Sequence, residues 1–118
     1  VYEALMGRTP LSACLQSTCV KGLSLIPADI RLAGAELELV ELERREYRLK
    51  HLLKTIEGDF DFLFVDCPPS LGLLTVNALT AAQRVLIPIN HCDNRIAGLP
   101  DVTVGQLVVQ AVDMIESM

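Results

Sequence analysis

The sequence predicts an α/β fold in which helices flank a parallel sheet. Two apolar runs of strand length, Phe62–Asp66 and residues 84–89, stand on either side of a helix-compatible segment at residues 71–82. Short links join the three segments in the order strand, helix, strand. Because such crossovers are right-handed and bring parallel strands into one sheet, we expect the helices to cover that sheet.

The composition fits one folded domain or a part of one. The chain has 118 residues, of which 51% are hydrophobic and 21% charged, so it can fill a core and is too apolar for a disordered segment. It contains no apolar run of membrane-spanning length and no recognisable signal peptide. The formal net charge of −5 differs from the basic charge of a typical nucleic-acid-binding domain, so we expect any DNA surface to lie mostly outside this chain.

Helical turns are expected at the start of the chain. Residues 1–6 are typical of the end of an amphipathic helix, which Gly7 closes. Thr9 is a suitable N-cap, and Pro10 is favourable at a first helical position. These two residues therefore predict a short helix that runs to about Ser17.

A strand and two helices are expected next. The apolar segment at residues 22–27 is of strand length and ends in proline. Residues 28–57 are helical in character and predict two helices with a break between them. Glu46 stands four residues before Lys50, a spacing that favours an ion pair on a solvated helix face. The apolar positions that share one face of the second helix are Leu49, Leu52, Leu53 and Ile56.

The second half of the chain predicts buried elements. Phe62–Asp66 begins with four consecutive apolar residues, which is typical of a strand buried on both faces. Ser70 can cap the following helix, which is apolar nearly all round and is therefore expected to be buried. Residues 84–89 predict another buried strand, and residues 104–118 a closing helix with an apolar stripe.

Asp66 is the main candidate functional residue. It stands at the carboxyl end of a predicted strand, where open α/β sheets bind ligands, and a hydrated magnesium ion would compensate its charge there. Cys67 precedes a proline and is biased to an extended conformation, while Pro68 and Pro69 cannot donate to a sheet. A strand with a terminal aspartate and a stiffened turn is what a Walker-B carboxylate and its switch loop require. An aspartate that merely caps a turn is the alternative, because the pattern is short and common.

Other chemistries have less support. Ser70 does not fit a hydrolase nucleophile, because the nucleophile elbow needs G-x-S-x-G and position 68 is proline. The cysteines form no C-x-x-C pair and are expected to be free thiols in a reducing cytosol. A thiol or metal site made of Cys67, His91 and Cys92 remains an option, since these residues follow two predicted strands, although no ligand spacing supports it. The four cysteines are Cys14, Cys19, Cys67 and Cys92.

Three sequence blocks resemble the ParA/Soj family of chromosome- and plasmid-partitioning ATPases, in that family's order and at its spacing. They are "LSLIPADIRLAGAELEL" at residues 23–39, "REYRLK" at residues 45–50 and "FDFLFVDCPPSLGLLTVNALTAA" at residues 60–82. The resemblance covers residues 1–90. Residues 91–118 diverge from the family and keep only Gly98-Leu99 recognisably.

The resemblance implies a partial P-loop NTPase fold of the deviant Walker class. Members dimerise around ATP, bind DNA non-specifically, and hydrolyse ATP with Mg²⁺ when a ParB-type partner stimulates them, in the cytoplasm on the nucleoid and without a membrane. Asp66 matches the Walker-B aspartate, which holds magnesium through water rather than directly, and Asn77 matches a buried structural position. The residues that match the loop sensing the γ-phosphate are Cys67, Pro68, Pro69 and Ser70.

The family's phosphate loop has no counterpart in this sequence. No G-x-x-x-x-G-K-[ST] occurs, and Lys21-Gly22 has the wrong order. With its start at Val1, the chain is therefore expected to be a partial ParA-type domain over residues 1–118, lacking the phosphate loop and the C-terminal third, and inactive as an ATPase on its own. The alternative is a truncated, non-enzymatic ParA-like interaction module. A start codon just upstream would favour the module, and an upstream phosphate loop would favour the partial domain.

Overall fold

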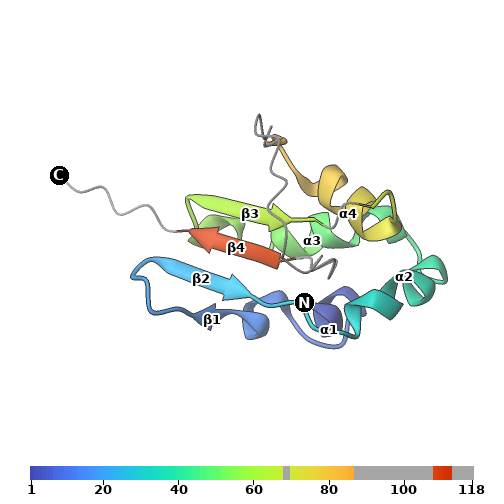
Figure 1. Cartoon of the computed structure of the whole chain (residues 1–118), viewed down its shortest axis with the longest axis horizontal. Helices are drawn as coiled ribbons and strands as arrows, with labels where there is room; N and C mark the ends of the chain where they lie inside the picture. Colours follow the sequence, from blue (N-terminus) through green and yellow to red (C-terminus); the bar gives the residue numbers. More distant parts are fainter. Residues whose placement is uncertain (68–69, 87–107, 113–118) are drawn as a thin grey trace, which may run out of the picture.

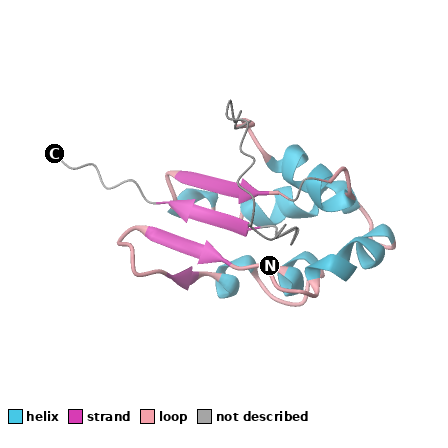
Figure 2. Ribbon diagram, viewed as in Figure 1, coloured by secondary structure: helices cyan, strands magenta, loops and turns pink. Residues whose placement is uncertain are grey.

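The computed structural model describes residues 1–67, 70–86 and 108–112. Within these ranges the strands form one sheet, and helices α3 and α4 lie on one side of it (Figures 1 and 2). No helix of the described residues is long and apolar enough to cross a membrane. The helices are α1 (Tyr2–Leu5), α2 (Leu32–Val40), α3 (Arg48–Leu53) and α4 (Leu73–Ala81), with 3₁₀ turns at Leu11–Cys14, Arg45–Tyr47 and Glu57–Asp59. The strands are β1 (Gln16–Ser17), β2 (Leu23–Ile26), β3 (Phe62–Asp66) and β4 (Val108–Val112).

The predicted mixture of helices and strands around a small sheet is confirmed, but the strand pairing differs from the expected parallel arrangement. The order in the sheet is β1-β2-β4-β3, and every described pairing is antiparallel. Strands β2 and β3 run in the same direction, as in the predicted fold, but β4 lies between them and is antiparallel to both. Two of the predicted strands, β2 and β3, therefore run parallel to each other without pairing directly.

Strand β4 also shows that the predicted helix at residues 104–118 is wrong over residues 108–112, whereas the rest of that segment lies outside the described residues. The segment reads Val-Val-Gln-Ala-Val, and its three β-branched residues favour a strand. Apolar residues at positions 108, 111 and 112 fit a helical stripe as well, so periodicity alone could not distinguish the two structures.

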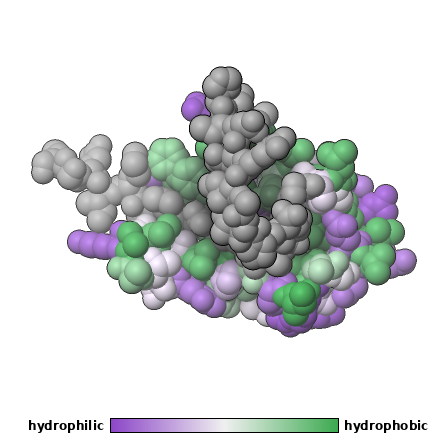
Figure 3. Space-filling model, viewed as in Figure 1, coloured by the Kyte–Doolittle hydropathy of each residue, from purple (hydrophilic) through white to green (hydrophobic). Residues whose placement is uncertain are grey.

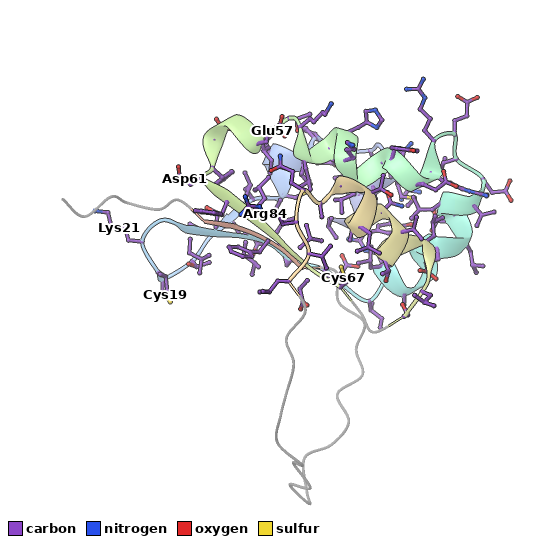
Figure 4. The ribbon with its side chains drawn as sticks, turned by 90° about the horizontal axis from the view of Figure 1, so that it is seen from above. Cys19, Lys21, Glu57, Asp61, Cys67 and Arg84 are labelled. Carbon is purple, nitrogen blue, oxygen red and sulfur yellow. The ribbon has the colours of Figure 1, made fainter. Side chains whose placement is uncertain are left out.

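Strand β3 has the predicted bounds, but it is not buried on both faces. Its residues alternate between exposed and half-buried: Phe62 and Phe64 are 47% and 49% exposed, while Leu63 and Val65 pack against the core. The two phenylalanine rings stack with centroids 6.3 Å apart. The described helices cover one face of the sheet, and none of them covers the other face of β3 (Figure 4).

The start of the chain matches the prediction in part. Helix α1 ends as expected at Gly7, whose φ of 76° is favourable for glycine. The N–H of Gly7 bonds the carbonyl of Ala4, and the N–H of Arg8 bonds that of Glu3, which is the Schellman pattern. The predicted helix from Pro10 to Ser17 is a 3₁₀ turn that ends at Cys14, and its cap is Pro10 rather than Thr9.

Strand β1 replaces the end of that predicted helix, because Gln16 and Ser17 pair with the predicted strand β2. The Thr18 hydroxyl stabilises the turn between the two strands by donating to the carbonyl of Leu23, at 2.9 Å. This pairing uses backbone groups that a helix would otherwise have used. Pairing with β2 therefore overrides the local preference for a helix.

Residues 28–57 form two helices with a break, as predicted. Arg44 has a φ of 51° at the break, and a 3₁₀ turn then leads into α3. Glu46 lies in this turn and pairs with Arg45 at 2.9 Å rather than with Lys50, because the two partners of the expected pair belong to different elements. Of the predicted apolar face, Leu49, Leu53 and Ile56 are buried and Leu52 is half-buried.

Helix α4 lies close to its predicted position but is not buried all round. Leu74 and Ala78 face the core, whereas Val76 and Leu79 are 38% and 51% exposed. In the space-filling view, apolar side chains reach the surface between charged ones (Figure 3). Of the strand predicted at residues 84–89, residues 84–86 are described and belong to no strand, and residues 87–89 lie outside the described residues.

Asn77 links α4 to the break between α2 and α3. Its side chain is fully buried, as the family resemblance implies, and is the one buried polar side chain of the described residues. Its Oδ1 accepts the N–H of Leu49 at 3.1 Å, and its Nδ2 donates to the carbonyls of Arg45 at 2.7 Å and Leu73 at 3.0 Å. The amide therefore satisfies backbone groups of two other elements.

Replacing Asn77 should destabilise the protein strongly. Asn77→Ala leaves the buried N–H of Leu49 and the carbonyl of Arg45 without this partner, which should lower the free energy of unfolding by roughly 2–4 kcal/mol in a urea titration. The matched control is Leu79→Ala in the same helix, which removes a half-exposed side chain and should cost less than about 1 kcal/mol. Equal losses for both variants would contradict the role of the amide.

Candidate functional site

Asp66 ends strand β3, as predicted, opposite Val108 of β4. It is exposed, and because side chains alternate along a strand it lies on the same face as Phe62 and Phe64, away from the covering helices. Within the described part of the chain, no residue forms an ion pair or hydrogen bond with its carboxylate. The carboxylate therefore lies on the face of β3 that the described helices leave open, and none of the described residues pairs with it.

Cys67 follows outside the sheet and is half-buried. Its thiol donates weakly to the carbonyl of Val65, at 3.9 Å. Burial raises the pKa of the Cys67 thiol, and the negative charge of Asp66 raises it further. Cys67 is thus held in its neutral form at neutral pH, which makes it a poor nucleophile and metal ligand.

The rest of the predicted switch loop is described only at its end. Pro68 and Pro69 lie outside the described residues. Ser70 is exposed and does not cap α4, so that prediction is wrong: the helix begins two residues further on, with Gly72 as its N-cap. Glu36 of α2 takes the place of a local cap, because its Oε1 accepts the N–H of Leu74 at 3.2 Å.

Sequence reasoning missed Glu36. The residue lies in a stretch of mixed charge, which is usually a solvated helix face. Gly72 was the one indication in the sequence that another residue caps this helix. A glycine N-cap has no side chain, so the first N–H groups of the helix must bond to partners elsewhere. Nothing in the sequence, however, says which distant residue supplies them.

The described residues contain no cluster of three or more histidine, cysteine or acidic side chains that could hold a metal. Figure 4 shows Cys19 in the turn between β1 and β2, well away from Cys67 at the end of β3. These two cysteines therefore share no site. His91 and Cys92, the other members of the thiol or metal option, lie outside the described residues.

Asp66 fits a magnesium ion that is held through water. Magnesium keeps several of its waters in proteins and is commonly bound by one or two carboxylates together with substrate phosphates. An exposed carboxylate without a protein partner can accept hydrogen bonds from such waters. Since the described residues place no cluster of acidic side chains around Asp66, water and phosphate oxygens would supply the other ligands.

Comparisons with known proteins give a consistent result. A family model described as AAA domain (AAA_31) matches residues 1–113. The chain is 44% identical over 103 residues to the chromosome partitioning protein ParA of Myxococcus xanthus, covering 87% of this chain and 36% of that protein. It is 48% identical over 89 residues to the sporulation initiation inhibitor protein Soj of Bacillus subtilis, covering 75% of this chain and 35% of that protein.

A solved structure also resembles the chain. It is described as cobyrinic acid a,c-diamide synthase from Mycobacterium smegmatis with bound ATP analog and magnesium, and it superposes with a TM-score of 0.66 at 52% sequence identity. The match covers 69% of this chain and 33% of that one. This chain therefore spans about one third of the length of the relatives that it matches.

Alkylation of Cys67 tests the electrostatics of the site. Because Asp66 raises the pKa of the thiol, Asp66→Asn should lower that pKa, although not to the value of an ordinary thiol, since burial is the larger cause. The rate of iodoacetamide labelling of the Cys67 peptide is measured by mass spectrometry against pH. The control is Asp59→Asn, which changes an exposed carboxylate in the 3₁₀ turn before β3. An unchanged or raised midpoint in Asp66→Asn would contradict the assignment.

Proposed function

This chain belongs to the AAA domain family, in its ParA/Soj group, and we propose that it serves in a partitioning ATPase that binds and hydrolyses ATP with magnesium to segregate DNA. The observation that carries the proposal is the position of Asp66. Within the described residues, an exposed carboxylate without an ion-pair or hydrogen-bond partner ends β3, inside the longest block shared with the family. Since the chain spans about one third of its relatives' length, the complete activity needs residues beyond those of this chain.

Asp66 has a binding and orienting role in this proposal. Its carboxylate would accept hydrogen bonds from the waters of a bound magnesium ion, which in turn supplies charge stabilisation at the phosphates. Cys67 remains a neutral thiol and adds no second negative charge beside the aspartate. The backbone of β3 fixes the position of the carboxylate before the ligand binds. Little conformational entropy is therefore lost on binding.

The cradle for the phosphates is assigned to other residues. Backbone N–H groups of a glycine-rich loop and its lysine provide that cradle in P-loop proteins, and this sequence contains no such motif. We therefore assign to this chain the magnesium-side carboxylate of Asp66 and the switch loop, with Cys67 and Ser70 at its ends.

The proposed partners follow from the family. A ParB-type protein would stimulate hydrolysis, the protein would dimerise around ATP, and the dimer would bind DNA non-specifically, which places it in the cytoplasm on the nucleoid. The chain's formal net charge of −5 differs from the basic charge of a typical DNA-binding domain. Most of the DNA contacts are accordingly assigned to residues outside this chain.

A second candidate is a non-enzymatic interaction module related to ParA. The exposed apolar side chains of β3 and α4 favour it, since large exposed apolar residues often mark a docking surface. The coding sequence upstream of Val1 distinguishes the two candidates. A phosphate loop there supports the ATPase, and a start codon directly before Val1 supports the module.

Replacing Asp66 tests the proposed ATPase. In the full-length protein, Asp66→Asn keeps the size of the side chain and removes its charge, so magnesium-dependent ATP hydrolysis should fall on the order of 100-fold or more. Phosphate release is measured with and without magnesium. Asp59→Asn is the control and should retain full turnover, because that exposed carboxylate precedes β3. Unchanged hydrolysis by Asp66→Asn would refute the role of the carboxylate.

A further inference from the structure

Helix α4 begins without a cap of its own. Its N-cap, Gly72, has no side chain, and the first N–H groups of a helix have no partners within it. The N–H of Leu74 bonds instead to Oε1 of Glu36, which lies 38 residues earlier in α2. Leu74 occupies the second helical position, where a local N-cap side chain would normally bond. A carboxylate is also favoured there by the helix dipole.

Gly72 makes this contact possible. A Cβ at position 72 would lie 2.0 Å from Oε1 of Glu36 and 2.7 Å from its Cδ. The backbone at Gly72 has a φ of −74° and a ψ of 177°, which any residue adopts easily. The glycine is therefore required by the approach of the carboxylate and not by its own conformation.

The start of α4 is also held from a second side. Asn77, one turn further along, donates to the carbonyls of Leu73 and Arg45 and accepts the N–H of Leu49. Glu36 fixes α4 to α2, and Asn77 fixes it to α3 and the turn before α3. These hydrogen bonds hold the chain from Leu73 onward, whereas Leu71 is 96% exposed. Gly72 therefore marks the boundary between the anchored helix and the segment that follows Asp66.

We infer that Glu36 is a positioning residue for the switch loop: its carboxylate, admitted by Gly72, anchors the downstream end of the segment that begins at Asp66. The consequence for activity rests on the proposed function, in which that segment responds to the nucleotide. The anchoring itself does not, because it is a property of the contact between α2 and α4.

A tryptophan at position 71 reports the anchoring directly. The chain contains no tryptophan, and Leu71 is almost fully exposed, so Leu71→Trp adds a probe next to Gly72 with little disturbance of the core. Any tryptophans elsewhere in the full-length protein are replaced by phenylalanine. The fluorescence anisotropy of this probe measures how tightly the end of the segment is held.

Glu36→Ala should lower the anisotropy, and Gly72→Ala should lower it by a similar amount, because the added Cβ displaces the carboxylate. The double variant should be no lower than either single one, since the two changes break the same contact. Glu36→Gln retains an acceptor oxygen and should restore most of the anisotropy. Glu41→Ala, an exposed position just after α2, is the matched control and should leave it unchanged.

Unchanged anisotropy in Glu36→Ala, or an additive loss in the double variant, would overturn the inference. In hydrolysis assays, Glu36→Ala should lower kcat about 5- to 10-fold and leave the KM for ATP nearly unchanged, because Glu36 orders the loop without touching the nucleotide. A fall confined to KM would also overturn it. If the protein without these substitutions hydrolyses no ATP, the proposed function fails, whereas the anisotropy still decides the role of Glu36.

Discussion

Side chains from other helices cap the N-termini of α3 and α4, and the arrangement of the site depends on these two caps. Asn77 of α4 accepts the N–H of Leu49 in the first turn of α3, and Glu36 of α2 accepts the N–H of Leu74 in the first turn of α4. Neither helix has a side-chain cap of its own. Short helices are marginal in isolation, so α3 and α4 need each other's context to form. The start of α4 is thereby held against α2, α3 and the turn before α3.

The sequence predicts best those features that local chemistry decides. The end of β3 at Asp66 follows from two prolines that cannot join a sheet, and the end of α1 follows from a glycine suited to positive φ. Strand β4 could not be predicted, because its apolar residues fit both periods and only the place between β2 and β3 selects the strand. The cap supplied by Glu36 could not be predicted either, since it depends on how α2 packs against α4.

The exposure of β3 and of α4 also differs from the prediction, and the two differences have a common cause. An apolar run indicates that the side chains of a strand or helix pack against other residues. It does not indicate that those other residues belong to the described part of the chain. Here the helices occupy one side of the sheet, so the run in β3 is covered on that side alone. The exposed apolar side chains of these two elements are Phe62, Phe64, Val76 and Leu79.

Asp66 lies on the same face of β3 as these exposed phenylalanines, the face that the described helices do not cover. Because side chains alternate along β3, Asp66 shares its face with Phe62 and Phe64, and a single-residue shift of register would have turned the carboxylate toward the core. A segment or partner that covers the whole of this face, from Phe62 to the end of β3, would also remove water from the carboxylate. Removal of water strengthens the attraction between a carboxylate and a cation, but it also makes an unpaired carboxylate costly. Under the proposed function, covering this face would therefore be favourable only where Asp66 has a cation nearby.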